Sequence, residues 1–197
     1  MAGWIARLAR GAAAGVLGTL AMDVLWWRRY RRGGGEDGFL DWEFATGVDS
    51  FEVASAPGRV GQRVAGLFGV DLPDEAAGAT TNAVHWLTGV GYGIAHEPVH
   101  DGDRPALRGL GTGVGAFANS YATLGALGVY EPIWQYDAAT LRDDLTAHLL
   151  FGTTTALFSR GGRAGASVGR SQPQQPEQRQ RHADHEQAQR GLGPRQP

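Results

Sequence analysis

Hydrophobic and polar positions in this chain are separated into long blocks rather than mixed from residue to residue. Residues 76–96 and 109–130 contain no Asp, Glu, Lys or Arg. Each block has about twenty residues, the length that an α-helix needs to cross a hydrocarbon core of about 30 Å. A short polar connection joins the two blocks. The pattern predicts two membrane-spanning helices, over about 76–96 and 107–130.

Two weaker blocks flank this pair. Residues 5–27 have a small, apolar interior, with Trp4 and Trp27 placed as anchors for the two membrane surfaces. A cleaved signal peptide is the alternative, but the Arg-rich run after Trp27 does not resemble a small-residue cleavage site. Residues 141–159 can span if the helix begins inside the interface. We therefore expect an all-α, multi-pass transmembrane helical bundle with about four spans.

The remaining segments are more polar. Residues 38–56 mix aromatic and acidic side chains, and apolar residues after Pro57 fall near helical spacing. We expect this region to include an amphipathic helix at the membrane surface. From residue 161 onward the chain is rich in Gly, Ser, Gln, Pro and Arg, which predicts a disordered polar tail over 161–197. Residues 1–160 form the predicted transmembrane domain.

The composition indicates a source and excludes some kinds of site. All 18 basic residues are Arg, and Gly and Ala are abundant, as expected for a GC-rich bacterial genome. The absence of Cys excludes disulfides and thiolate metal sites. A net charge of −2 gives no reason to expect a nucleic-acid partner. The mean hydropathy of −0.26 is low for a membrane protein, so a soluble helical protein with a Gly- and Ala-rich core is the competing interpretation.

Polar side chains inside the predicted spans are the candidate site. An ionisable group in a membrane costs about 2.5–3.5 kcal/mol on insertion scales, so each needs a reason to be there. By position, His85 and Asn119 fall near the bilayer midplane on adjacent helices. The predicted intramembrane binding cluster consists of His85, Asn119, Asp144, His148, Asp23 and Asn82.

Each of these residues also has a structural interpretation. His85 could be held by a hydrogen bond to Asn119, and Asp23 could face interfacial water. Asp144 and His148 lie one helical turn apart, a spacing that suits a divalent metal or a proton relay. Equally, Asp144 could cap its helix while His148 packs in the core. A metal bound by His85, His148 and Asp144 has suitable ligand types, but the identity of any metal or cofactor is unknown from sequence.

Small residues at four-residue spacing accompany the polar ones. In the third predicted span Gly111 and Gly115 precede Asn119 and Thr123 at this spacing. Such spacing lets helix backbones approach closely, so we expect this face to lie inside the bundle. The same glycine-rich faces could join two copies of the chain. The predicted partners are therefore the lipid bilayer and a second copy of the protein.

The chain also resembles the YagU-like family of uncharacterised small bacterial inner-membrane proteins. The resemblance covers about residues 85–160 and rests on His85 followed by Gly91-Tyr92, a Gly/Ala-rich helix opening at Gly109, and Asp144 before His148-Leu149. It implies a multi-pass protein of the bacterial inner membrane. The family has no established biochemical activity, so the resemblance implies no mechanism.

No catalytic motif is present: the sequence lacks G-x-S-x-G, H-E-x-x-H and Walker A patterns. We therefore predict that the protein is not an enzyme. The leading hypothesis is that its polar cluster handles protons, a small cation or a solute. The alternative is a non-catalytic membrane protein in which these residues hold the bundle together or dock a partner.

Overall fold

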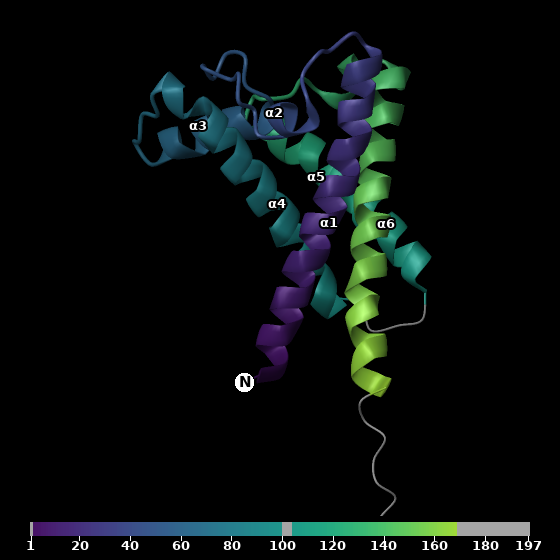
Figure 1. The fold of residues 1–197 in the computed structure, drawn as a ribbon. Helices are drawn as coiled ribbons and strands as arrows, with labels where there is room; N and C mark the ends of the chain where they lie inside the picture. The colour runs from purple at the N-terminus through teal and green to yellow at the C-terminus, as the bar shows by residue number, and fades with distance from the viewer. Residues whose placement is uncertain (1, 100–103, 169–197) are drawn as a thin grey trace, which may run out of the picture. The chain divides into compact units, whose positions relative to one another are not determined.

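The computed structural model describes residues 2–99 and 104–168, and every regular element in them is helical. The elements are α1 (Ala2–Arg32), α2 (Phe39–Glu43), α3 (Ala56–Leu67), the 3-10 turn η1 (Asp74–Ala76), α4 (Ala77–Val99), α5 (Pro105–Ala126), the 3-10 turn η2 (Ile133–Gln135) and α6 (Ala138–Val168) (Figure 1). The all-α prediction is confirmed. The described residues up to Gly162 form one compact unit.

The four long helices α1, α4, α5 and α6 coincide with the four predicted spans. The short helices α2 and α3 fall in the segment predicted for the membrane surface, and α3 covers the residues after Pro57 whose apolar spacing predicts a helix. Helix α6 continues to Val168, so residues 161–168 are helical although the predicted tail includes them. The rest of that tail, residues 169–197, lies outside the described residues.

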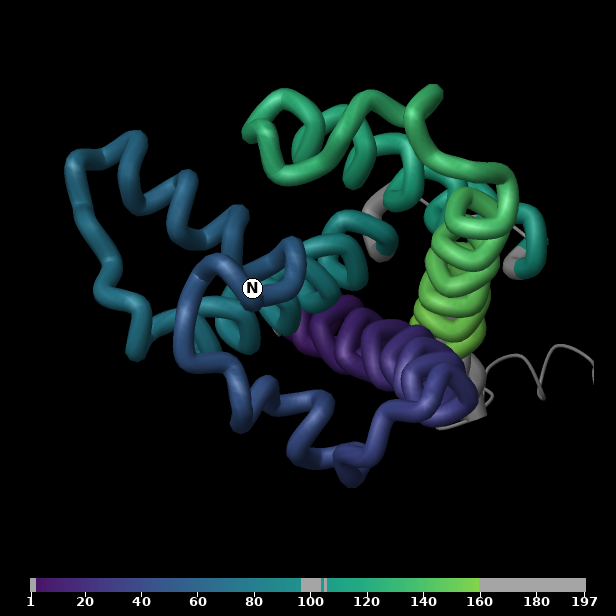
Figure 2. The backbone as a smooth tube through the Cα atoms, turned by 90° about the horizontal axis from the view of Figure 1, so that it is seen from above, coloured from purple at the N-terminus to yellow at the C-terminus, as the bar shows by residue number. Residues whose placement is uncertain are grey.

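Helices α1 and α4 lie side by side because glycine allows their backbones to meet (Figures 1 and 2). A Cβ added at Gly15 would overlap the carbonyl of Gly89, and one added at Gly93 would overlap that of Gly11. At Gly18, an added Cβ would lie 2.9 Å from the Phe151 carbonyl, so α6 also approaches α1 at a glycine. The predicted glycine-mediated packing is therefore present.

On α5 the packing face differs from the predicted one. A Cβ at Gly109 would lie 2.6 Å from the Thr153 Cα, and one at Gly113 would lie 2.6 Å from the His148 carbonyl. Gly111 and Gly115 have nothing within 4 Å, and Asn119 and Thr123 on the same face are exposed. The prediction that this face lies inside the bundle is wrong. It remains open, and self-association through it stays a prediction.

The interior holds small side chains and the surface holds large apolar ones. The largest fully buried side chains are Thr19 and Thr155, and alanines make up most of the buried apolar core. Exposed large apolar residues occur on all four long helices: Trp4, Ile5, Leu8, Leu17, Val24, Leu87, Leu107, Leu110, Val114, Leu150, Leu157 and Phe158.

One helix among the described residues is long and apolar enough to cross a membrane. It is the stretch Gly3–Arg32 of α1, which contains an 18-residue window of mean hydropathy 1.4. A signal sequence or the core helix of a soluble protein can share these properties. The helices at the other three predicted spans do not meet the same criterion.

Candidate metal centre

The register between α1 and α4 brings two predicted site residues together. Thr19 is almost fully buried, and a Cβ at Gly89 would overlap its hydroxyl, so these two residues face each other across the helix pair. Asp23 follows Thr19 by one turn on α1, and His85 precedes Gly89 by one turn on α4. Because the helices are antiparallel, Asp23 and His85 then lie at the same level.

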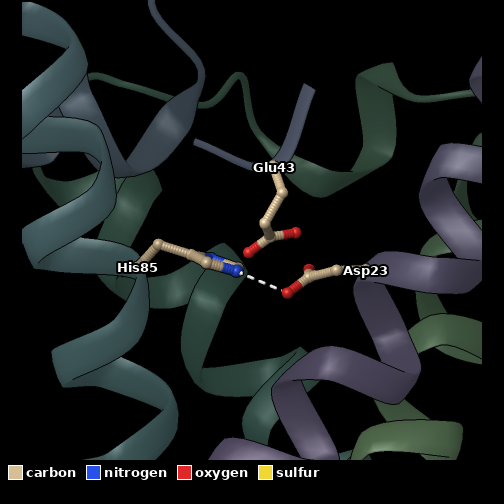
Figure 3. Close-up of side chains that lie close together, drawn as sticks. All are labelled: Asp23, Glu43 and His85. Carbon is tan, nitrogen blue, oxygen red and sulfur yellow. Dashed lines mark hydrogen bonds and ion pairs between the residues drawn. The ribbon is translucent and has the colours of Figure 1, made fainter. Parts of the chain in front are cut away.

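Asp23 and His85 form a direct contact (Figure 3). The Asp23 Oδ2 and His85 Nε2 atoms are 2.9 Å apart, and Asp23 is only 3% exposed. The interpretation that Asp23 faces interfacial water is therefore wrong. The hydrogen bond between His85 and Asn119 is not formed either, since His85 bonds to Asp23 and Asn119 donates to the Tyr92 hydroxyl.

A third ligand-type side chain, Glu43, comes from α2. The chain turns back after α1, and two ring contacts hold α2 against the end of that helix: Trp27 with Phe39 at 5.7 Å, and Tyr30 with Trp42 at 6.2 Å between centroids. Glu43, at the last position of α2, then points toward the Asp23–His85 pair (Figure 3). One ligand atom from each of the three residues lies within 4.8 Å of the others.

Asn82, another predicted site residue, is not one of the three potential ligands, but it holds the end of α2 in place. Its side-chain amide donates to the carbonyl of Phe44, the residue after Glu43, at 2.7 Å. It also donates to the Gly78 carbonyl one turn earlier in α4 at 2.9 Å. The amide thus ties the end of α2 to α4 and fixes where Glu43 lies.

The electrostatics of the cluster are unfavourable for a fully ionised state. Burial raises the pKa of Glu43 from 4.5 to about 7, helped by the charge of Asp23 and a hydrogen bond to it, and opposed by His85. Glu43 is 8% exposed, and its Oε1 atom is buried with no hydrogen-bond partner. Two carboxylates beside one imidazole leave excess negative charge, which a bound cation would balance.

Two carboxylate oxygens and one imidazole nitrogen are a ligand set for a divalent first-row metal. Carboxylates suit Mn²⁺, while imidazole suits Fe²⁺ and Zn²⁺. Three protein ligands leave coordination positions open, unlike the closed four-ligand sites of structural zinc. The chemistry of the donor set therefore fits an exchangeable cation.

The remaining predicted site residues lie elsewhere. Asp144 and His148 contact each other, with 3.4 Å between Asp144 Oδ1 and His148 Nδ1. Asn119 is exposed and donates to the Tyr92 hydroxyl at 2.6 Å. In the part of the chain that the structure describes, the only potential metal-ligand group of three residues is that of Asp23, Glu43 and His85. The hypothetical ligand set of His85, His148 and Asp144 is not brought together.

Sequence reasoning missed Glu43 because it placed the residue in a surface segment. The available signal was an acid among aromatic residues, since Trp42 and Phe44 flank Glu43 directly. Such neighbours would favour burial of the carboxyl group.

Comparisons with protein-family models, curated proteins and solved structures find no match for this chain. The resemblance to the YagU-like family therefore stays a prediction, and the function has to be argued from the site.

Proposed function

We propose that the chain is a multi-pass helical protein of a bacterial inner membrane that binds a divalent metal cation at Asp23, Glu43 and His85. The observation that carries the metal site is the convergence of these three ligand atoms from three helices within 4.8 Å, with one buried carboxylate oxygen left without a partner. The proposed role is to bind or pass the cation, and no substrate chemistry is assigned.

The distribution of side chains supports the membrane part of the proposal. In water-soluble proteins Leu, Ile and Phe fill the core, whereas membrane helices associate through Gly, Ala, Ser and Thr and present large apolar side chains to lipid. Here Leu87 is 69% exposed while Thr19 is 1% exposed. The exposed Leu67 and Phe68 at the end of α3 fit a helix lying in the interface.

Proton handling is a second candidate function, favoured by a specific observation. Glu43 titrates near neutral pH, and its neighbours Asp23 and His85 already share a 2.9 Å contact. Three such groups exchange protons as a unit. If protons rather than metal are handled, Glu43→Gln should abolish proton flux in proteoliposomes, and added Mn²⁺ should have no effect on it.

Metal binding can be tested on the full chain in detergent after removal of bound metal with a chelator. Calorimetric titration with Mn²⁺ and Zn²⁺ should give one site per chain. The titration should use a background carrying His182→Gln and His185→Gln, which removes two histidines of the polar tail. Asp23→Asn and His85→Gln should each weaken metal binding by at least about tenfold. Mutation of residues that only support a metal ligand already costs about this much in affinity, so loss of a ligand should cost no less.

The matched control is the other acid–imidazole pair of the chain. Asp144→Asn and His148→Gln alter a similar pair on α6 and should leave the affinity unchanged. Binding that survives all changes at Asp23, Glu43 and His85 would overturn the proposal. An absence of binding, combined with a lower thermal stability of the His85→Gln variant, would instead support a purely structural cluster.

Membrane insertion has its own test. We expect the full chain to stay with the membrane fraction after carbonate extraction. Release into carbonate, with a monodisperse species in plain buffer, would refute the membrane assignment and leave the metal site to be tested in solution.

A further inference from the structure

A cavity lies apart from the Asp23–Glu43–His85 centre and shares no residue with it. Its volume is about 470 Å³. The walls come from α1, from α3, from the last turns of α5, and from the connection between α5 and α6 with the first turns of α6. Its lining includes Arg59, Tyr121, Tyr130, Glu131, Tyr136 and Asp144.

Arg59 provides the positive wall of this cavity. Its Nε atom is buried and has no hydrogen-bond partner, and no described carboxylate forms an ion pair with its guanidinium group. A guanidinium group presents several donors in a fork that matches phosphate or carboxylate oxygens. An anionic group on a ligand would satisfy these donors.

Tyrosine rings provide another wall. The Tyr121 centroid lies 5.3 Å from that of Tyr130 and 5.4 Å from that of Tyr136, and the last two rings are 6.0 Å apart. The Tyr136 hydroxyl accepts a hydrogen bond from the Glu131 backbone amide at 3.1 Å, which fixes the ring beside this acid. Clustered aromatic faces with nearby carboxylates are the environment that binds an ammonium group.

Negative charge completes the arrangement. Glu131 is exposed, while Asp144 is largely covered and contacts His148. One cavity therefore offers a guanidinium group, three tyrosine rings and two carboxylates. A simple anion would meet repulsion from both acids, and a simple cation would meet repulsion from Arg59. A ligand carrying both charges avoids both penalties.

We propose that this cavity binds a zwitterion of the phosphoethanolamine class, with the phosphate at Arg59 and the ammonium between the tyrosine rings and the carboxylates of Glu131 and Asp144. The same chemistry occurs in a phosphatidylethanolamine headgroup and in the free, water-soluble headgroup. The lipid source rests on the proposed membrane function, because the exposed apolar end of α3 would set Arg59 near the depth of the headgroups.

The test uses the purified full chain and two ligand arms. In the first arm, native mass spectrometry measures which lipid is retained from an equimolar mixture of phosphatidylethanolamine, phosphatidylglycerol and phosphatidylcholine. In the second arm, calorimetry measures the binding of glycerophosphoethanolamine. We expect phosphatidylethanolamine to be retained preferentially if the lipid is the source, and glycerophosphoethanolamine to bind without lipid if the soluble form is.

Variants in α3 distinguish binding at Arg59 from a general attraction of the ligand to positive charge. Arg59→Gln should lower the binding of whichever ligand is recognised by about tenfold or more, as expected for the loss of hydrogen bonds to a charged group. Arg59→Lys should retain part of it. Arg63→Gln changes an exposed arginine one turn further along the same helix and should have no effect.

Three outcomes would overturn this proposal: no binding in either arm, equal retention of phosphatidylglycerol, or the same loss with Arg63→Gln as with Arg59→Gln. The thermal unfolding midpoint of each variant shows whether the fold survives. Because the two sites share no residue, failure of the metal site leaves headgroup binding measurable, and the converse also holds. Failure of membrane insertion would remove only the lipid arm.

Discussion

Replacing Glu43 by Gln should make the metal-free protein more stable at alkaline pH and leave it nearly unchanged in acid. The substitution keeps the shape of the side chain and removes its charge. In the native protein this carboxyl group is buried beside Asp23, and its Oε1 atom has no hydrogen-bond partner. The ionised form is therefore poorly accommodated when no cation is bound.

The size and sign of the effect follow from the pKa of Glu43. Folding raises this pKa from 4.5 to about 7, which corresponds to about 3 kcal/mol of preference for the neutral form. Between these two values the native protein holds a proton that the unfolded chain has released. Stability therefore falls as the pH rises from about 4.5 through 7, and the full penalty is present above that range. Gln carries no such penalty.

The assay is thermal unfolding of the full chain in detergent with a chelator, from pH 5 to pH 8. The difference in Tm between Glu43→Gln and the unchanged protein should grow across this range toward about 6–12 °C, the shift that about 3 kcal/mol gives in a chain of this size. Added Mn²⁺ should then stabilise the unchanged protein more at pH 8 than at pH 5, and it should stabilise the variant much less. A pH-independent difference would refute the reasoning about this carboxyl group.

Three further predictions concern packing and positioning. Gly89→Ala places a Cβ against the buried Thr19 and should cost about 1–3 kcal/mol. Gly91→Ala, with nothing within 4 Å, should leave the Tm unchanged or raise it slightly in the same measurement, because Ala favours a helix over Gly. Asn82→Ala should weaken Mn²⁺ binding about tenfold, as measured by calorimetry, because the tie between α2 and α4 is lost. Asp137 caps α6 by accepting from the backbone amides of the second and third residues after it, and these bonds lower its pKa. The contribution of the Asp137 carboxylate to stability is therefore present above pH 3.8 and is lost as the pH falls below this value. Asp137→Ala should then lower the Tm at pH 6 and have less effect at pH 2.

Helices α4 and α5 could be predicted because charge-free blocks of about twenty residues mark them directly, and α1 and α6 because shorter apolar stretches flank that pair. The packing face of α5 could not. Glycines stand at every second position from Gly109 to Gly115, so two faces of the helix carry the same four-residue spacing. Only the contact of Gly109 and Gly113 with α6 decides between them. Sequence spacing alone was therefore ambiguous at this helix.

The candidate site was predicted in part. Asp23, His85 and Asn82 were all chosen for their polarity inside apolar segments, and all three lie at or beside the centre. The other three members of the predicted cluster, Asn119, Asp144 and His148, lie elsewhere, because depth was counted from the ends of the charge-free blocks. The actual register is set by a tertiary contact, Thr19 against Gly89. The position of Glu43 depends on a second tertiary contact, the packing of α2 against the end of α1.

These observations join the small residues and the polar site into one arrangement. Thr19 and Gly89 permit the close approach of α1 and α4, and one turn away the same approach brings Asp23 to His85. A larger residue at position 89 would push the helices apart and lengthen the Asp23–His85 contact. A centre whose ligands come from three helices can hold a cation only while that separation is kept. The glycine at position 89 therefore serves the geometry of the site as well as the stability of the bundle.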